Sequence, residues 1–234
     1  MSEEHYDPLL ELLEKFPAAA DYLSTIVLIQ RDYGEVHNSQ LALRLGVSKP
    51  AVTQAISRLK KLKLIKAQGS GTICLTEQGH EWGNKIITRH YLVEHLLIKN
   101  NYPWDKADEE AQRLQAVISQ DLADHLFESF GHPQICPHGN PFPGSKAEHM
   151  LISAPRLITL KRGESFRLLR ITEEGEGIVG LLKFCHQKNI HPGLELSVID
   201  NLEDLCVHLQ DLEGQSITIP WSFACHICIE IITK

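Results

Sequence analysis

The stretch that decides the fold covers residues 38–76 and reads NSQLALRLGVSKPAVTQAISRLKKLKLIKAQGSGTICLT. In its first part Leu41 and Leu45 recur four residues apart, which predicts one apolar side of a short helix. Gly46 follows at a point where the end of a helix favours a left-handed residue. Ser48 is a favourable N-cap for a second helix directly after this turn. This punctuation predicts a helix-turn-helix.

The second helix of this motif has two faces of opposite character. Val52, Ile56 and Leu59 recur at i, i+4 and i+7, so we expect them to face the core. Eight residues at the start and on the outer face of this helix are expected to contact DNA. They are Ser48, Lys49, Pro50, Thr53, Gln54, Ser57, Arg58 and Lys61. Such a helix is suited to a nucleic-acid groove.

The rest of the stretch fits a winged variant of the motif. Residues 64–67 and 72–76 are predicted as short strands around the turn-forming residues 68–71. Residues 36–76 contain seven Lys or Arg and no Asp or Glu, whereas the whole chain of 234 residues has a formal charge of −7. A basic island that coincides with a helix-turn-helix predicts DNA binding.

The composition is that of an ordinary globular protein, with 43% hydrophobic residues. No apolar run approaches the roughly 20 residues of a membrane span, and the acidic N-terminus lacks a signal-peptide pattern. We therefore expect a cytoplasmic protein. The six cysteines are scattered, which favours free thiols or ligands in a reducing compartment. No nucleophile-and-base arrangement or phosphate loop appears, so an enzyme is not expected.

The pattern of apolar residues predicts five further helices before and after the motif in the sequence. They are expected at residues 7–16, 18–32, 77–99, 106–119 and 120–130. The last three have more apolar residues than a lone helix trio needs to cover. A homodimer interface is therefore the preferred interpretation, and a monomeric cap on the winged helix is the alternative.

The chain after these helices changes character. Residues 131–144 are a Pro- and Gly-rich loop, and 145–155 continue it as a linker. Short β segments are then predicted at residues 157–160, 165–171, 195–200, 206–209, 216–219 and 227–232, with a helix at 178–188. Short strands at this spacing suggest a small SH3-like barrel.

The predicted fold class is α+β, in three domains. Residues 1–80 form a winged helix-turn-helix with an extra N-terminal helix, 81–152 form a helical dimerisation and metal-binding domain, and 153–234 form the barrel.

Several sequence blocks together resemble the diphtheria toxin repressor family of iron- and manganese-dependent regulators. These blocks are Ala51–Leu59 on the second helix, Leu75–Gly79 after the wing, Arg89–His90 with Glu94, Glu109–Ala111, Val117–Ser119, and Cys136–Pro141. In the barrel, Leu181–Leu182 before Ile190–Gly193 resembles the FeoA-like C-terminal domain of the longer members. The resemblance covers nearly everything after Ala18 and leaves the first helix as an addition.

The resemblance implies a primary, activating metal site. Asp21, on the helix expected at residues 18–32, matches the acidic residue of this site. His90, on the long helix expected at residues 77–99, matches its histidine. Its remaining three positions, on the next helix, fall on Gln112, Gln115 and Ala116. Neutral amides are poor ligands for a divalent transition metal, and alanine supplies none. We therefore expect this site to be vacant or weak, and Asp21 remains only a minor candidate ligand.

The resemblance also implies a second metal site, whose residues are better preserved. His90 and Glu94 stand at i, i+4 on one helical face, and Cys136 and His138 are two apart in a loop restricted by prolines. One acidic residue of the barrel completes the set, chosen among Glu173, Glu174 and Glu176. Glu174 is the candidate carried forward, and Asp108 is an ancillary one. Such donors suit one Mn, Fe or Zn ion per subunit, with zinc favoured by the thiolate. The alternative is that Cys136 and His138 are an inherited structural feature without metal.

These features together predict a homodimeric transcriptional regulator of the metal-dependent repressor type that binds an inverted-repeat operator in double-stranded DNA. The resemblance implies control of metal-homeostasis genes. The alternative is a metal-independent regulator of the same fold, controlled by another ligand or partner. A metal-handling protein without DNA binding is disfavoured by the basic helix.

Overall fold

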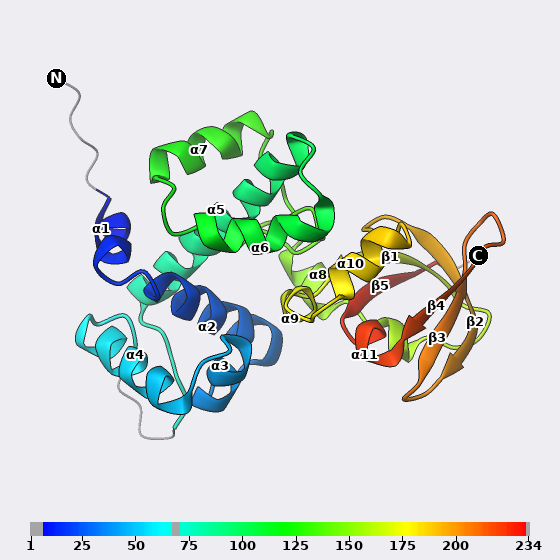
Figure 1. Cartoon of the computed structure of the whole chain (residues 1–234), viewed down its shortest axis with the longest axis horizontal. Coiled ribbons are helices and arrows are strands. Elements are labelled where there is room, and N and C mark those ends of the chain that lie inside the picture. Colours follow the sequence, from blue (N-terminus) through cyan, green and yellow to red (C-terminus); the bar gives the residue numbers. More distant parts are fainter. Residues whose placement is uncertain (1–6, 67–70, 233–234) are drawn as a thin grey trace. The chain divides into compact units, whose positions relative to one another are not determined.

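The computed structural model describes residues 7–66 and 71–232. Helices form the N-terminal part and an antiparallel sheet the C-terminal part, so the predicted α+β class is confirmed (Figure 1). The chain divides into two compact units, Met1–Leu96 with Glu109–His132 and Leu97–Asp108 with Pro133–Lys234. The predicted three-domain division remains a prediction. Within the described residues, no helix is both long enough and apolar enough to cross a membrane.

Seven helices belong wholly or partly to the first unit. They are α1 (Pro8–Lys15), α2 (Ala19–Tyr33), α3 (Asn38–Arg44), α4 (Lys49–Lys61), α5 (Glu77–Lys99), α6 (Trp104–Leu114) and α7 (Gln120–Ser129). The division cuts through two of them, because the last residues of α5 and the first residues of α6 are assigned to the second unit.

The extra helix α1 is well anchored in the first unit. Asp7 caps it by accepting hydrogen bonds from the backbone nitrogens of Leu9 and Leu10, at 3.0 and 3.2 Å. The same carboxylate forms an ion pair of 2.7 Å with the fully buried Arg89 of α5. Leu9 and Leu13 are buried on the inner side of the helix. The helix is therefore held both by its buried apolar face and by the hydrogen bonds and ion pair of Asp7.

The helix-turn-helix forms as its punctuation predicts. Gly46 has φ +63°, the left-handed conformation that the turn between α3 and α4 requires. Ser48 then caps α4 by accepting a hydrogen bond of 3.3 Å from the backbone nitrogen of Ala51. Val52, Ile56 and Leu59 are buried beneath α4. The apolar stripe thus fixes which face of α4 remains outside.

The base of the wing pairs over a shorter stretch than the two predicted strands. Ile65 and Leu75 form an isolated antiparallel bridge, and the Lys66 nitrogen donates a hydrogen bond of 2.8 Å to the Cys74 carbonyl. A third segment joins them, because the Ile73 nitrogen donates to the Val36 carbonyl at 2.8 Å. Residues 67–70 of the predicted wing lie outside the described residues.

The second unit contains a five-stranded antiparallel sheet in the order β4-β3-β2-β1-β5. Its strands are β1 (Ser165–Ile171), β2 (Glu195–Leu202), β3 (Cys206–Gln210), β4 (Ser216–Pro220) and β5 (Ile227–Ile232). In β1, residues alternate between the two faces, and Phe166 and Leu168 are buried. β1 pairs with β2 on one side and with β5 on the other, so it is an inner strand of the sheet.

Short helices precede these strands or lie between them along the chain. They are α8 (Glu148–Ser153), the 3₁₀ helix η1 (Leu157–Thr159), α9 (Glu173–Glu176), α10 (Leu181–Gln187) and α11 (Trp221–Ala224). Leu181 and Cys185 of α10 share one hydrophobic core with Phe166 and Ile229 of the sheet. Among the described residues, the edge strands β4 and β5 are not paired with each other. In the chain, α11 connects them.

Several predicted elements differ in the structure. The predicted strand 157–160 is wrong: residues 157–159 form η1, because a 3₁₀ turn directs both Leu157 and Leu160 into the core three residues apart. The predicted linker 145–155 contains α8, which buries Leu151. The helix predicted at 106–119 ends at Leu114. The helix predicted at 178–188 begins at Leu181, because Gly180 with φ +88° precedes it.

Candidate functional site

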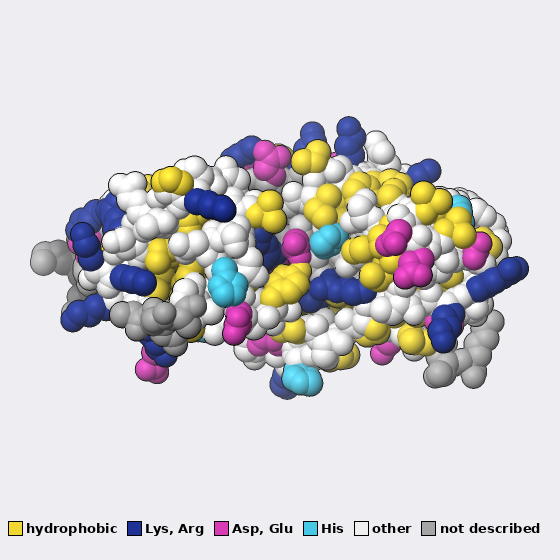
Figure 2. Space-filling view, turned by 90° about the horizontal axis from the view of Figure 1, so that it is seen from below, with side chains coloured by type: hydrophobic (Ala, Val, Ile, Leu, Met, Phe, Trp, Pro, Cys, Tyr) yellow, Lys and Arg dark blue, Asp and Glu magenta, His cyan; other side chains and the backbone are white. Residues whose placement is uncertain are grey.

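The outer face of α4 is polar, basic and fully open. Lys49, Thr53 and Lys61 are exposed, whereas Val52 and Leu59 on the opposite side are completely buried. One shallow hollow of the surface is lined by Lys49, Pro50, Thr53, Gln54, Ser57, Arg58 and Lys61. Several Lys and Arg side chains show in dark blue on the first unit in Figure 2. The structure therefore brings all the predicted DNA-contact residues onto one helix face, with Ser48 at its cap.

Arg58 has a particular environment on this face. Its Nη2 donates a hydrogen bond of 2.9 Å to the carbonyl of Lys15, at the end of α1. Its guanidinium carbon lies 4.1 Å from the centre of the Phe16 ring, which is a cation–π contact. The extra helix therefore orients one of the cations of the recognition helix, a relation that no sequence pattern indicated.

The primary metal position contains a hydrogen-bonded cluster of one carboxylate and two amides. Nε2 of Gln112 donates to Oδ1 of Asp21 at 2.7 Å, and Nε2 of Gln115 donates to the same atom at 3.4 Å. Burial raises the pKa of Asp21, and the hydrogen bonds from Gln112 and Gln115 offset part of this rise. Both amides thus present their nitrogens, not their oxygens, to the carboxylate.

This donor set does not fit a divalent transition metal. Each amide NH₂ group is a hydrogen-bond donor and lacks a lone pair for a metal. Ala116 offers no ligand atom, and among the described residues Asp21 belongs to no cluster of three His, Cys, Asp or Glu side chains. That this position is vacant or weak remains a prediction.

His90 and Glu94 lie one turn apart on α5. Both are buried, and Nε2 of His90 is 3.3 Å from Oε1 of Glu94. A buried carboxylate beside an imidazole requires a compensating cation or proton. Asp108, the ancillary candidate, is half-buried on α6.

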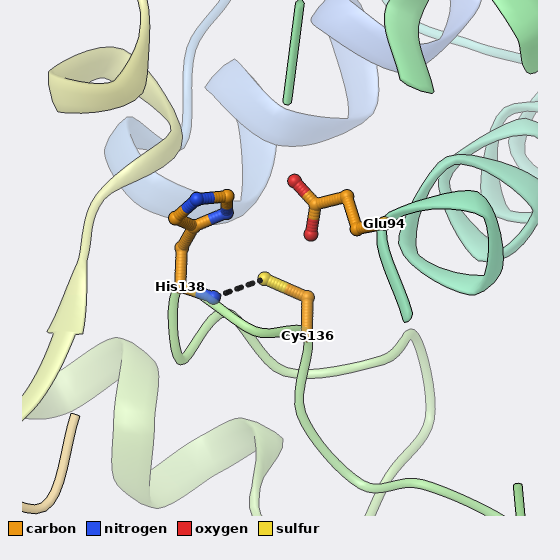
Figure 3. Close-up of side chains that lie close together, drawn as sticks. All are labelled: Glu94, Cys136 and His138. Carbon is orange, nitrogen blue, oxygen red and sulfur yellow. Dashed lines mark hydrogen bonds between the residues drawn. The ribbon is translucent and has the colours of Figure 1, made fainter. Parts of the chain in front are cut away.

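Cys136 and His138 lie in a tightly closed loop of the second unit. The His138 nitrogen donates a hydrogen bond of 3.3 Å to Sγ of Cys136, drawn as a dashed line in Figure 3. The His138 carbonyl accepts a hydrogen bond of 3.0 Å from the nitrogen of Ile171, so the loop is fixed to the end of β1. Gly139 has φ +93°, and a Cβ there would lie 2.2 Å from the Leu169 carbonyl oxygen. Only glycine fits this close approach.

The hydrogen bonds of His138 decide which ring nitrogen has a lone pair. Nε2 lies 3.1 Å from the carbonyl oxygen of Trp104, which can only accept, so Nε2 has the proton. In the neutral ring Nδ1 therefore has the lone pair. A backbone carbonyl that fixes the tautomer in this way is the usual partner of a metal-binding histidine.

Glu176 of α9 approaches His138. Its Oε2 lies 3.9 Å from Nδ1 of His138, whereas the candidate Glu174 is half-buried on the same short helix. Asn140 donates hydrogen bonds to Oε1 of Glu176 and to the Ile171 carbonyl. Arg170 in turn donates to Oδ1 of Asn140 at 2.8 Å. Sequence spacing could not distinguish three glutamates within four residues, since the difference lies in this buried network.

Two family models match consecutive parts of the chain. The DNA-binding domain of iron-dependent repressors matches residues 16–72, and their metal-binding and dimerisation domain matches residues 76–144. The iron-dependent repressor IdeR of Mycobacterium tuberculosis (strain H37Rv) is 32% identical over 124 residues, which are 53% of this chain and 54% of the relative. The chain thus spans about half the length of the curated relatives that it matches first.

Solved structures extend the likeness to most of the chain. A manganese-dependent transcriptional repressor in complex with manganese has a TM-score of 0.78 at 25% identity, covering 92% of this chain and all of that chain. The crystal structure of T. acidophilum IdeR has a TM-score of 0.70 at 26% identity, covering 91% and 97% of the two chains. These relatives are repressors and not enzymes. The chain belongs to the iron-dependent repressor family.

Proposed function

We propose that the chain is a transcriptional regulator of the metal-dependent repressor type, which binds an inverted-repeat operator as a homodimer. The observation that carries this proposal is the outer face of α4, where exposed cations and amides stand on a helix with a fully buried inner side. Lys49, Arg58 and Lys61 contact DNA phosphates and supply most of the affinity. Gln54 is suited to the paired donor and acceptor on the edge of adenine.

The dimer part of the proposal rests on apolar side chains that the described chain leaves at the surface. Val117, in the connection between α6 and α7, is 65% exposed, and Leu122, in the first turn of α7, is 40% exposed. A second copy is the partner that covers them, because one helix-turn-helix reads only a half-site and two-fold symmetry doubles the site. The matching family model also covers this segment and is described as a dimerisation domain.

For the metal, the proposal is one divalent ion bound by Glu94, Cys136 and His138. It is supported by the burial of all three residues, each of which has an atom that can bind a metal. It is also supported by the lone pair on Nδ1 of His138. When bound, the ion would supply a positive charge that compensates the buried carboxylate. The mixture of thiolate, imidazole and carboxylate suits zinc, iron or manganese.

A second candidate set is His90, Glu94 and Asp108, in which Nε2 of His90 lies 3.3 Å from Oε1 of Glu94 on α5. We assign the ion to the group with the thiolate, because a cysteine and a tautomer-fixed histidine bind more strongly than a histidine with two carboxylates. Glu176, rather than Glu174, is the acidic residue of α9 that supports His138.

The experiment that tests DNA binding is selection of duplexes from a random pool by the purified protein, with and without a chelator. The expected product is an inverted repeat. Enrichment of no sequence under either condition would contradict the proposal. Enrichment that is identical with and without chelator would favour the alternative, a metal-independent regulator controlled by another ligand or partner.

The experiment that tests the metal assignment is metal analysis of purified variants. Cys136→Ala and His138→Ala should each abolish tight binding of zinc or manganese, because each removes one of three donors. Asp21→Ala should leave the ion in place and is the matched control at the primary position. Two ions per subunit in the wild type, or loss of the only ion in Asp21→Ala, would show that the assignment is wrong.

A further inference from the structure

The contact between Asp21 and the two glutamines joins two helices of the first unit. Asp21 stands in the first turn of α2, the helix that begins the DNA-binding domain. Gln112 lies on α6 and Gln115 directly follows it, with its backbone nitrogen still bonded to the Ala111 carbonyl at 2.9 Å. Both side chains therefore extend from one rigid segment to a single carboxylate oxygen.

The chemistry of this contact is complete with the groups of the chain alone. A carboxylate oxygen has more than one lone pair, so it can accept from two amide NH₂ groups at once. Hydrogen bonds to an ionised acceptor are the strong ones. Gln115 is only 1% exposed and its bond to Asp21 is partly buried, which reduces competition from water. Each amide nitrogen stands where a cation would otherwise neutralise Asp21.

We propose that Gln112 and Gln115 are positioning residues that tie α2 to α6 directly and hold the DNA-reading helices without a metal ion at Asp21. The donor set argues for this. The position cannot bind a transition metal, yet the Asp21 carboxylate accepts a hydrogen bond from each amide. The inference rests on the proposed DNA-binding function. It adds that this function depends on a permanent, metal-free link, so that metal control acts only through Glu94, Cys136 and His138.

The first test removes the donors and keeps the fold. Gln112→Ala with Gln115→Ala should lower operator affinity about tenfold or more in chelator, and added Mn²⁺ or Zn²⁺ should not restore it. Asp21→Asn should weaken operator binding less than the double alanine variant does, since the neutral amide oxygen still accepts both hydrogen bonds but more weakly than a carboxylate. Gln187→Ala, an exposed glutamine at the end of α10, is the matched control. Unchanged affinity in the double alanine variant, or a greater loss in Asp21→Asn than in the double alanine variant, would overturn the proposal.

The second test converts the link into a metal site. Gln112→Glu with Gln115→Glu places three carboxylates together, which repel one another without a cation. DNA binding should then be lost in chelator and restored by Mn²⁺, with one additional ion per subunit in metal analysis. A double glutamate variant that binds DNA equally well in chelator, or that gains no ion, would show that the position does not couple α2 to α6.

A readout independent of DNA separates the failure of this inference from that of the proposed function. Amide hydrogen exchange in the first turns of α2 should speed up in the double alanine variant and stay unchanged in Gln187→Ala. If no duplex is bound by the wild type but exchange responds as stated, the DNA function is wrong and the link stands. If exchange is unaffected, the link is wrong whatever the protein binds.

Discussion

Removing two cations from the outer face of α4 should flatten the salt dependence of DNA binding. Lys49→Ala with Lys61→Ala changes exposed side chains and leaves the buried stripe of Val52, Ile56 and Leu59 untouched. Each phosphate contact contributes a slope of about 0.9 in log affinity against log salt concentration. A dimer loses about four such contacts, so the slope should fall by about 3.6. Between about 50 and 200 mM salt, the wild type should then lose about 150-fold more affinity than the variant.

The assay is fluorescence anisotropy of a labelled operator duplex over a series of salt concentrations. Lys183→Ala with Lys188→Ala removes the same charge from exposed positions at α10 and serves as the control. The control should change the slope by less than about 1, which is one phosphate contact. Equal flattening in both double variants would reduce the effect to net charge. An unchanged slope in Lys49→Ala with Lys61→Ala would refute the assignment of the DNA-binding face to α4.

Two more predictions concern specificity and assembly. Gln54→Ala should weaken operator binding by about 1–3 kcal/mol while leaving the affinity for random duplex nearly unchanged, measured by competition; equal loss for both would show that Gln54 reads no base. Sedimentation velocity should show a dimer at micromolar concentration, and Val117→Asp with Leu122→Asp should give a folded monomer, because charged side chains then occupy the apolar surface. A wild-type monomer at that concentration would mean that Val117 and Leu122 do not form an interface.

The parts of the fold that local chemistry specifies were predictable from the sequence. The helix at residues 77–99 has the predicted bounds, and Ser48 and Gly46 have the cap and turn roles assigned to them. Each of these depends on a periodic apolar pattern or on a single residue with a strong backbone preference. The incorrect predictions concern segments whose pattern is compatible with more than one backbone conformation. Leu157 and Leu160 satisfy the core equally from a strand or a 3₁₀ turn, so their pattern could not distinguish the two.

The candidate sites were predictable as residue sets but not as geometries. The sequence showed that Gln112 and Gln115 are unsuitable ligands, but not that their amides donate to Asp21. It also left three glutamates of α9 as equals, whereas Asn140 and Arg170 fix Glu176 beside His138. In both cases the deciding contacts join residues at least 30 positions apart. Such contacts follow from the packing of whole elements, which spacing along one helix or loop does not encode.

The contact of Arg58 with α1 predicts a role for the extra helix in DNA binding. A free arginine side chain loses much rotamer freedom when it binds a phosphate. Here the Phe16 ring and the Lys15 carbonyl already restrict the guanidinium, and they use only part of its five donors. The remaining donors can bind a phosphate at a smaller entropic cost than those of Lys61, whose side chain is exposed. We therefore expect α1, although it lies outside the family pattern, to strengthen DNA binding through Arg58 without contacting a base.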